Sequence, residues 1–179
     1  MTLAEEIDAL LPQTQCTQCG YQGCLPYAEA LAAGEAEINR CPPGGDAGIA
    51  RLAALLGKPV IPLDPTCGQH LPHRVAVIDA QNCIGCAKCL KVCPTDAIIG
   101  ANKYLHSVMP QFCTGCGLCI PPCPVDCIDM VADPLYPALP DANPSRIRFH
   151  AHQARQVRDQ QEREAALAAR EATVLKGLT

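Results

Sequence analysis

From Cys83 to Pro124 the chain reads CIGCAKCLKVCP, then a spacer, then CTGCGLCIPPCP. Each half has the pattern C-x2-C-x2-C-x3-C-P, and the second half begins thirty residues after the first, so the unit is duplicated. This spacing is typical of bacterial two-cluster iron–sulfur proteins, in which the fourth cysteine of each half binds the cluster of the other half. The stretch therefore predicts a small duplicated domain organised around two inorganic clusters.

The crossed pattern divides eight cysteines between two [4Fe–4S] clusters. The second cluster of the chain is predicted on Cys83, Cys86, Cys89 and Cys123. The third is predicted on Cys113, Cys116, Cys119 and Cys93. Gly85 and Gly115 occupy the same slot in the two loops, where the backbone must curl tightly. Zinc binding and a disulfide framework are the alternatives, but zinc ligands usually come as two pairs, not as a triplet plus one.

Four more cysteines precede the duplication at the spacing C-x2-C-x4-C-x16-C, namely Cys16, Cys19, Cys24 and Cys41. Between the last two, Pro26 and Gly34 frame a short helix that would return the chain to the site. The spacing alone fits either a [4Fe–4S] cluster or a zinc ion. The two clusters that follow favour a cluster here too, because a third cluster would extend an electron relay.

The predicted fold class is α+β, with a two-[4Fe–4S] ferredoxin-like domain between a small helical domain and a charged C-terminal helix. Strands are expected at Arg74–Asp79, Ala97–Ile99, Leu105–Met109 and Cys127–Val131, on either side of the cluster loops. Asp46 is expected to cap a helix that Gly57 closes. The boundaries are 1–57 for the helical domain, 58–72 for a Pro-rich linker, 73–132 for the ferredoxin domain, 133–150 for a Pro-rich extended segment and 151–179 for the charged helix.

Composition limits the class of protein. The 179 residues include 14 Cys, no Trp and only 3% aromatic residues, so clusters are expected to supply cohesion that side-chain packing lacks. The triplet spacing indicates a reduced metal protein rather than a secreted disulfide scaffold. The first residues show no signal peptide, and no apolar run is long enough for a transmembrane helix. We therefore expect a cytoplasmic chain.

Charge is divided unevenly along the chain. Up to Ser145, seven basic residues stand against fourteen acidic ones, whereas from Arg146 onward seven stand against four. An acidic body with a basic tail suggests electrostatic orientation on protein partners, and nothing in the pattern indicates nucleic-acid binding.

The remaining cysteines and histidines are not predicted to be ligands. Cys67 has no partner at ligand spacing, and His70 and His73 are expected to be solvated linker residues. Cys127 aligns with Ala97 in the repeat, which predicts a small buried side chain near a cluster. The sequence has no dinucleotide fingerprint and no phosphate loop, so we expect no catalytic residues.

From about Ile7 to Val131 the sequence resembles the RnfB-like ferredoxins of the Rnf, or Rsx, electron-transport complex. DALLPQTQCTQCGYQGCLPYAEAL, INRCPPGG and both cysteine-rich halves match the pattern of that family. The resemblance implies a [4Fe–4S] cluster on the N-terminal four cysteines. It also implies electron relay between a flavin- and cluster-bearing subunit and membrane subunits. That family usually begins with a membrane-anchoring helix, which this sequence lacks, so a soluble relative or a peripheral subunit at the cytoplasmic face of the inner membrane is expected.

The sequence thus predicts an iron–sulfur electron carrier without a substrate site of its own. One alternative is a structural or redox-sensing scaffold that docks a partner through its basic C-terminal helix. Another is a subunit of an oxidoreductase whose catalytic centre lies on a separate chain.

Overall fold

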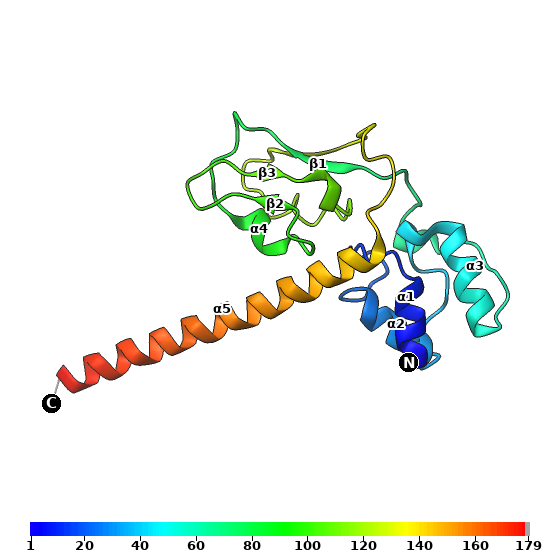
Figure 1. The fold of residues 1–179 in the computed structure, drawn as a ribbon, viewed down its shortest axis with the longest axis horizontal. Helices are drawn as coiled ribbons and strands as arrows, with labels where there is room; N and C mark the ends of the chain where they lie inside the picture. The colour runs from blue at the N-terminus through cyan, green and yellow to red at the C-terminus, as the bar shows by residue number, and fades with distance from the viewer. Residues whose placement is uncertain (178–179) are drawn as a thin grey trace.

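The computed structural model describes residues 1–177, with side chains through Val174 (Figure 1). The α-helices are α1 (Leu3–Leu10), α2 (Cys24–Ala32), α3 (Gly45–Leu56), α4 (Lys88–Val92) and α5 (Ala142–Gly177). The strands are β1 (Val75–Ile78), β2 (Ile98–Ile99), β3 (Ser107–Val108) and β4 (Ile128–Val131). Single 3₁₀ turns lie at Pro42–Gly44, Pro65–Cys67 and Pro110–Phe112.

Helices α1, α2 and α3 form the N-terminal unit, residues 1–57. The capping box of Thr2 and Glu5 starts α1, because the Thr2 hydroxyl accepts from the Glu5 N–H while the Glu5 carboxylate accepts from the Thr2 N–H. The three helices enclose a small apolar core that includes Ile7, Tyr27, Ile38, Ile49 and Leu52. This core holds the loops that carry the first four cysteines.

The two ends of α3 differ in how well the sequence predicts them. Gly57 ends the helix in a left-handed conformation with φ +63°, as expected for a glycine at this position. The prediction that Asp46 caps the start is wrong. The cap position is Gly44, no side chain caps the helix, and Asp46 lies inside the first turn, where its charge still complements the helix dipole.

The ferredoxin unit, residues 73–132, contains two small antiparallel sheets. Strand β1 pairs with β4, with Val75 opposite Val131, and β2 pairs with β3, with Ile98 opposite Val108. Each sheet therefore joins the strand before one cysteine loop to the strand after the other. The two halves interlock, and small sheets together with helices make the architecture α+β.

Helix α5 begins nine residues earlier than the expected start at Ala151. The segment expected to be extended ends at Asp141, and Pro144 stands in the first turn of the helix, where its missing N–H breaks no intrahelical bond. The first turns of α5 lie between the N-terminal and ferredoxin units, and the rest projects away from both (Figure 1). The last two residues of the predicted tail lie outside the described residues.

Within residues 1–177, every helix is too short or too polar to cross a membrane.

Candidate iron–sulfur centres

The structure brings the twelve predicted ligands together as three groups of four, each around its own cavity. Cavity 1 is lined by Cys16, Cys19, Cys24 and Cys41. Cavity 2 is lined by Cys83, Cys86, Cys89 and Cys123. Cavity 3 is lined by Cys93, Cys113, Cys116 and Cys119. The groups coincide with the sets predicted from spacing, including the exchange of Cys93 and Cys123 between the halves.

A chain of buried polar side chains shapes the wall of cavity 1. The Gln15 side-chain oxygen accepts from the Cys24 N–H at 2.8 Å, and the Gln15 amide donates to Gln13 at 2.8 Å. Gln13 in turn donates to the Asp8 carboxylate, which also receives the Arg146 guanidinium of α5 at 2.8 Å. Gln13 and Gln15 are only 1% and 4% exposed. The network fixes the start of α2, and with it the position of the third cysteine.

Thr14 offers cavity 1 a polar group that the protein does not otherwise use. Its hydroxyl lines the cavity, is buried, and has no hydrogen-bond partner within the described residues. A buried hydroxyl without a partner is costly, and cluster sulfur accepts hydrogen bonds. Four thiols and one free hydroxyl facing an otherwise apolar space therefore fit an iron–sulfur cluster.

Burial makes free thiolates unfavourable in these cavities. Desolvation raises the pKa of Cys24, Cys41, Cys116 and Cys119 to about 12. It also raises the pKa of Cys19, Cys89 and Cys93. Cluster ligands are thiolates, so a bound cation must offset the cost of deprotonating them.

Backbone N–H groups point at the cysteine sulfurs of cavity 3. The Ala97 N–H donates to the Cys93 sulfur at 3.2 Å, and the Ala76 N–H donates to the Cys113 sulfur at 3.4 Å. Such donors stabilise negative charge on sulfur and are one of the means by which proteins tune clusters.

Cavity 2 carries two side chains that sequence reasoning did not place in the site. His106 is 4% exposed, and its Nδ1 lies 3.5 Å from the sulfur of Cys83. The sulfur of Cys127 lies 3.6 Å from that of Cys123. Burial and the hydrogen bond with Cys123 raise the pKa of Cys127 to about 12, so Cys127 is the protonated partner of the pair.

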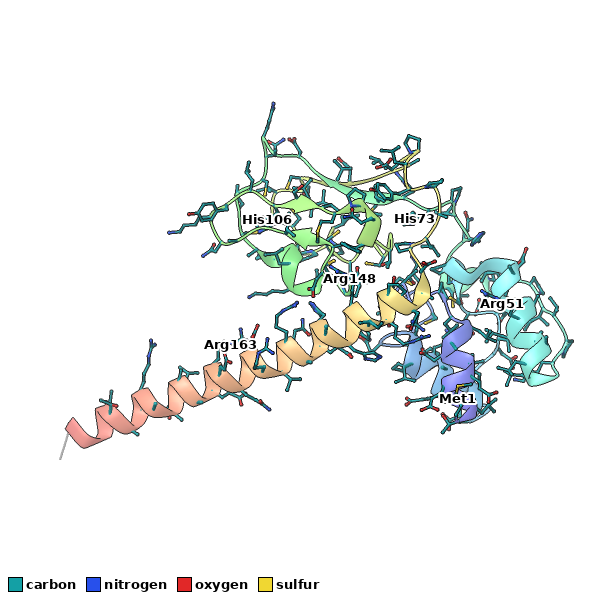
Figure 2. The ribbon with its side chains drawn as sticks, viewed as in Figure 1. Met1, Arg51, His73, His106, Arg148 and Arg163 are labelled. Atoms are coloured by element: carbon teal, nitrogen blue, oxygen red, sulfur yellow. The ribbon has the colours of Figure 1, made fainter. Side chains whose placement is uncertain are left out.

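Cavities 1 and 3 meet where the two units touch. Thr14 lines cavity 1, Thr114 lines cavity 3, and the Thr114 hydroxyl donates to the Thr14 carbonyl at 3.1 Å. Beside this contact, Arg148 of α5 lies over the Phe112 ring at 3.9 Å and donates to the Thr95 carbonyl at 2.6 Å (Figure 2). Helix α5 thereby fastens the wall of cavity 3.

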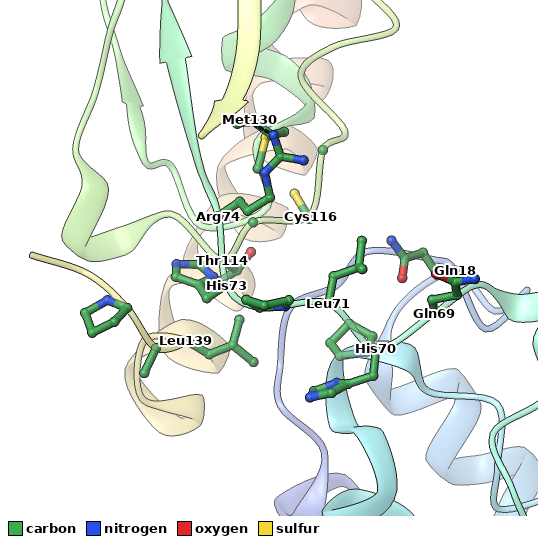
Figure 3. A pocket seen from close by; sticks show the side chains of 16 residues that line it. Gln18, Gln69, His70, Leu71, His73, Arg74, Thr114, Cys116, Met130 and Leu139 are labelled. Atoms are coloured by element: carbon green, nitrogen blue, oxygen red, sulfur yellow. Dashed lines mark hydrogen bonds between the residues drawn. The ribbon is translucent and has the colours of Figure 1, made fainter. Parts of the chain in front are cut away.

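A larger cavity of about 650 Å³ opens where the linker passes between the two units (Figure 3). His73 and Arg74 line it, together with Cys116, which also faces cavity 3. The expectation that His73 is simply solvated is wrong, because its Nε2 is buried and has no partner within the described residues. His70 is exposed, and its Nδ1 lies 2.8 Å from the Pro42 carbonyl oxygen. Cys67, predicted to be incidental, is buried against Asp64 and lines none of the three cysteine cavities.

Two family models match the chain, in the regions that hold the cavities. Residues 76–130 match the family described as "4Fe-4S dicluster domain", and residues 11–43 match the family described as "Putative Fe-S cluster". The chain therefore carries iron–sulfur domains in both units.

Curated relatives share one name, which makes them the B component of the "Ion-translocating oxidoreductase complex". The protein of Thiobacillus denitrificans is 59% identical over 107 residues, which cover 60% of this chain and 57% of the relative. That of Alkalilimnicola ehrlichii is 60% identical over 109 residues, covering 60% and 58%. That of Hahella chejuensis is 58% identical over 132 residues, covering 74% and 66%.

The chain resembles the B component of the ion-translocating oxidoreductase complex. The resemblance inferred from the cysteine motifs is thus confirmed. The chain spans less than two thirds of the length of each of these B-component relatives.

Proposed function

We propose that the protein is an electron carrier with three [4Fe–4S] clusters, one in each cysteine-lined cavity. The observation that carries the proposal is the grouping of twelve cysteines into three sets of four, each facing one cavity. When bound, a [4Fe–4S] cluster takes up and returns a single electron. The protein supplies thiolate ligands, N–H donors to sulfur and exclusion of water.

The proposed ligand sets are supported by the interlocked strands as well as by the cavities. Because β1 pairs with β4 and β2 with β3, the cysteine before Pro94 is carried to the second loop, and the cysteine before Pro124 to the first. A zinc site in cavity 1 remains the competing proposal there. The free Thr14 hydroxyl favours the cluster, since the sulfides of a cluster are hydrogen-bond acceptors and a zinc ion with four thiolates is not.

We place the three clusters in a row, with the cluster of cavity 3 in the middle. Cavity 3 adjoins cavity 1 through the hydrogen bond of Thr114 to Thr14. It adjoins cavity 2 through the shared loops, since each of these two cavities takes its fourth cysteine from the other half of the repeat. An electron entering at either end would therefore cross the whole molecule.

We infer from the relatives' name that the protein works in an ion-translocating oxidoreductase complex. The partners proposed are redox subunits of that complex, including one with flavin and membrane subunits. The 58–60% identity to the B-component relatives supports this, although it covers only part of their length. On this proposal the protein lies at the cytoplasmic face of the membrane.

Anaerobic iron and sulfide analysis with an EPR-monitored redox titration tests the proposed function. About twelve iron and twelve sulfide per chain, with reversible low-potential signals, are expected for three clusters. About eight iron and one zinc would make cavity 1 a structural zinc site. Clusters that cannot be reduced and reoxidised without loss of iron would contradict electron transfer.

A further inference from the structure

The two cluster cavities of the ferredoxin unit differ at two equivalent positions. The repeat of thirty residues that relates Cys83 to Cys113 also relates His106 to Ala76, and Cys127 to Ala97. Ala76 and Ala97 line cavity 3, whereas His106 and Cys127 line cavity 2. Two alanines at one cluster are thus replaced by two hydrogen-bonding side chains at the other.

His106 is positioned to donate to a cluster ligand. Its Nδ1 lies 3.5 Å from the Cys83 sulfur, and its ring packs on Gly100, where an added Cβ would overlap the ring. A thiolate bound to iron has no proton, so the nitrogen must be the donor in the loaded protein. The glycine leaves room for the ring and holds it against the sulfur.

Cys127 makes the corresponding contact on the other side of cavity 2. Its sulfur lies 3.6 Å from that of Cys123, and it is 6% exposed. Cys123 is the proposed ligand and would be a thiolate, so the S–H of Cys127 is the donor. At the equivalent place in cavity 3, Ala97 offers only its backbone N–H.

We propose that His106 and Cys127 make the two ferredoxin clusters unequal, so that the electron rests on the cluster held by Cys83, Cys86, Cys89 and Cys123. Reduction adds negative charge that spreads onto the ligand sulfurs, and each additional donor stabilises the reduced form. The cluster of cavity 2 therefore has the higher reduction potential, and an electron arriving through cavity 3 moves on to it. His106 and Cys127 are positioning residues, because they act through the ligands. The proposal rests on the proposed function, since it needs both clusters to be present.

A redox titration of His106→Ala, Cys127→Ala and the double variant tests the proposal. These substitutions place in cavity 2 the residues that occupy cavity 3. The less negative of the two ferredoxin potentials is expected to shift to a more negative value in each single variant and further in the double variant, so that the two potentials converge. His106→Asn, which keeps a side-chain donor, is expected to shift less than His106→Ala. His150→Ala removes an exposed histidine of α5 and is expected to leave all potentials unchanged.

A measurement on the unaltered sequence removes the dependence on how well the variants fold. Protein labelled with ¹⁵N-histidine and partly reduced is expected to show a ¹⁵N coupling on the EPR signal of the higher-potential ferredoxin cluster. The coupling should be absent from labelled His106→Asn. Absence of the coupling from the unaltered protein would overturn the proposal for His106, even if the alanine variants lose iron.

Iron content separates failure of this proposal from failure of the proposed function. Full iron and sulfide in every variant, with unchanged potentials, would overturn the inequality and leave the electron carrier intact. Lack of iron and sulfide in the unaltered protein would instead overturn the proposed function itself.

Discussion

Gly115 and Gly117 lie two residues apart in the second cluster loop, and both have left-handed backbone, with φ +69° and +72°. Their surroundings differ. A Cβ on Gly115 would lie 2.6 Å from the Arg74 carbonyl oxygen, whereas a Cβ on Gly117 would meet nothing within 4 Å. The pair therefore separates backbone strain from crowding at almost the same place in the chain.

We predict that Gly115→Ala is much more damaging than Gly117→Ala. Alanine at Gly117 adds only the cost of a left-handed side chain, about 1–2 kcal/mol. Alanine at Gly115 adds a clash with backbone that holds strand β1, so the loop must move and the cysteines with it. The rate at which cluster absorbance is lost on anaerobic heating measures both. Equal rates for the two variants would show that the close contact with Arg74 is not important.

The two cysteines in contact at cavity 2 are predicted to differ in the same direct way. Cys123→Ala removes a proposed ligand, and we expect it to lose about four iron, the content of one cluster. Cys127→Ala removes only a neighbour of that ligand and should keep the full iron content. Iron and sulfide analysis of the two purified variants decides the matter. Loss of a cluster from Cys127→Ala alone would make Cys127 the ligand instead.

Helix α5 contacts one half of the repeated element and not the other. Asp96 and Asp126 are equivalent, with φ +50° and +47°, but only Asp96 is bound by α5, through His152 at 2.7 Å and Arg155 at 2.8 Å. Partial burial raises the pKa of Asp96, but the hydrogen bonds from Arg155 and His152 outweigh this effect and leave the pKa below its usual value. The Asp96 carboxylate is therefore charged where it meets the helix.

Asp96→Asn is predicted to loosen α5, while Asp126→Asn should not. Asparagine tolerates the left-handed turn in both variants but lacks the charge that pairs with Arg155, a loss of about 1 kcal/mol at this partly exposed position. Hydrogen exchange of the α5 backbone around residues 148–156 is expected to accelerate in Asp96→Asn alone. Equal protection in both variants would mean that the other contacts suffice to hold the helix.

Some elements could be predicted from the sequence because their signal is local. The strands beside the cysteine loops and the capping box of α1 follow from alternation and spacing, and the structure confirms them. The start of α5 could not be predicted in this way. The first turns of the helix are stabilised by Arg146 and Arg148, whose partners lie more than fifty residues away in the chain.

The same contrast holds for the cavities. Spacing groups the cysteines, but the Gln13 and Gln15 network depends on a turn with left-handed backbone at both residues, φ +56° and +54°, which no propensity predicts for glutamine. His106 could have been found from the sequence, because the thirty-residue offset aligns it with Ala76. Its importance appears only when the ring is seen against the sulfur of Cys83.

At the scale of the whole molecule, α5 ties the two cluster-bearing units together. Arg146 bonds Asp8 in the N-terminal unit, and Arg148 bonds the Thr95 carbonyl in the ferredoxin unit. The helix then continues past both units, and its residues from 161 to 174 are exposed. The inner turns therefore set the distance between cavities 1 and 3, and the outer turns do not.

The double variant Arg146→Ala/Arg148→Ala is predicted to separate the units. Removing Arg146 leaves the buried Asp8 carboxylate short of a partner, at a cost of about 1–3 kcal/mol, and removing Arg148 frees the Thr95 carbonyl. We expect a larger radius of gyration in solution scattering and slower electron exchange between the cluster of cavity 1 and the other two. Arg158→Ala/Arg163→Ala removes the same charge from exposed turns of the same helix and should change neither. If both double variants behaved alike, the Thr114 to Thr14 contact and the linker would hold the units together without α5.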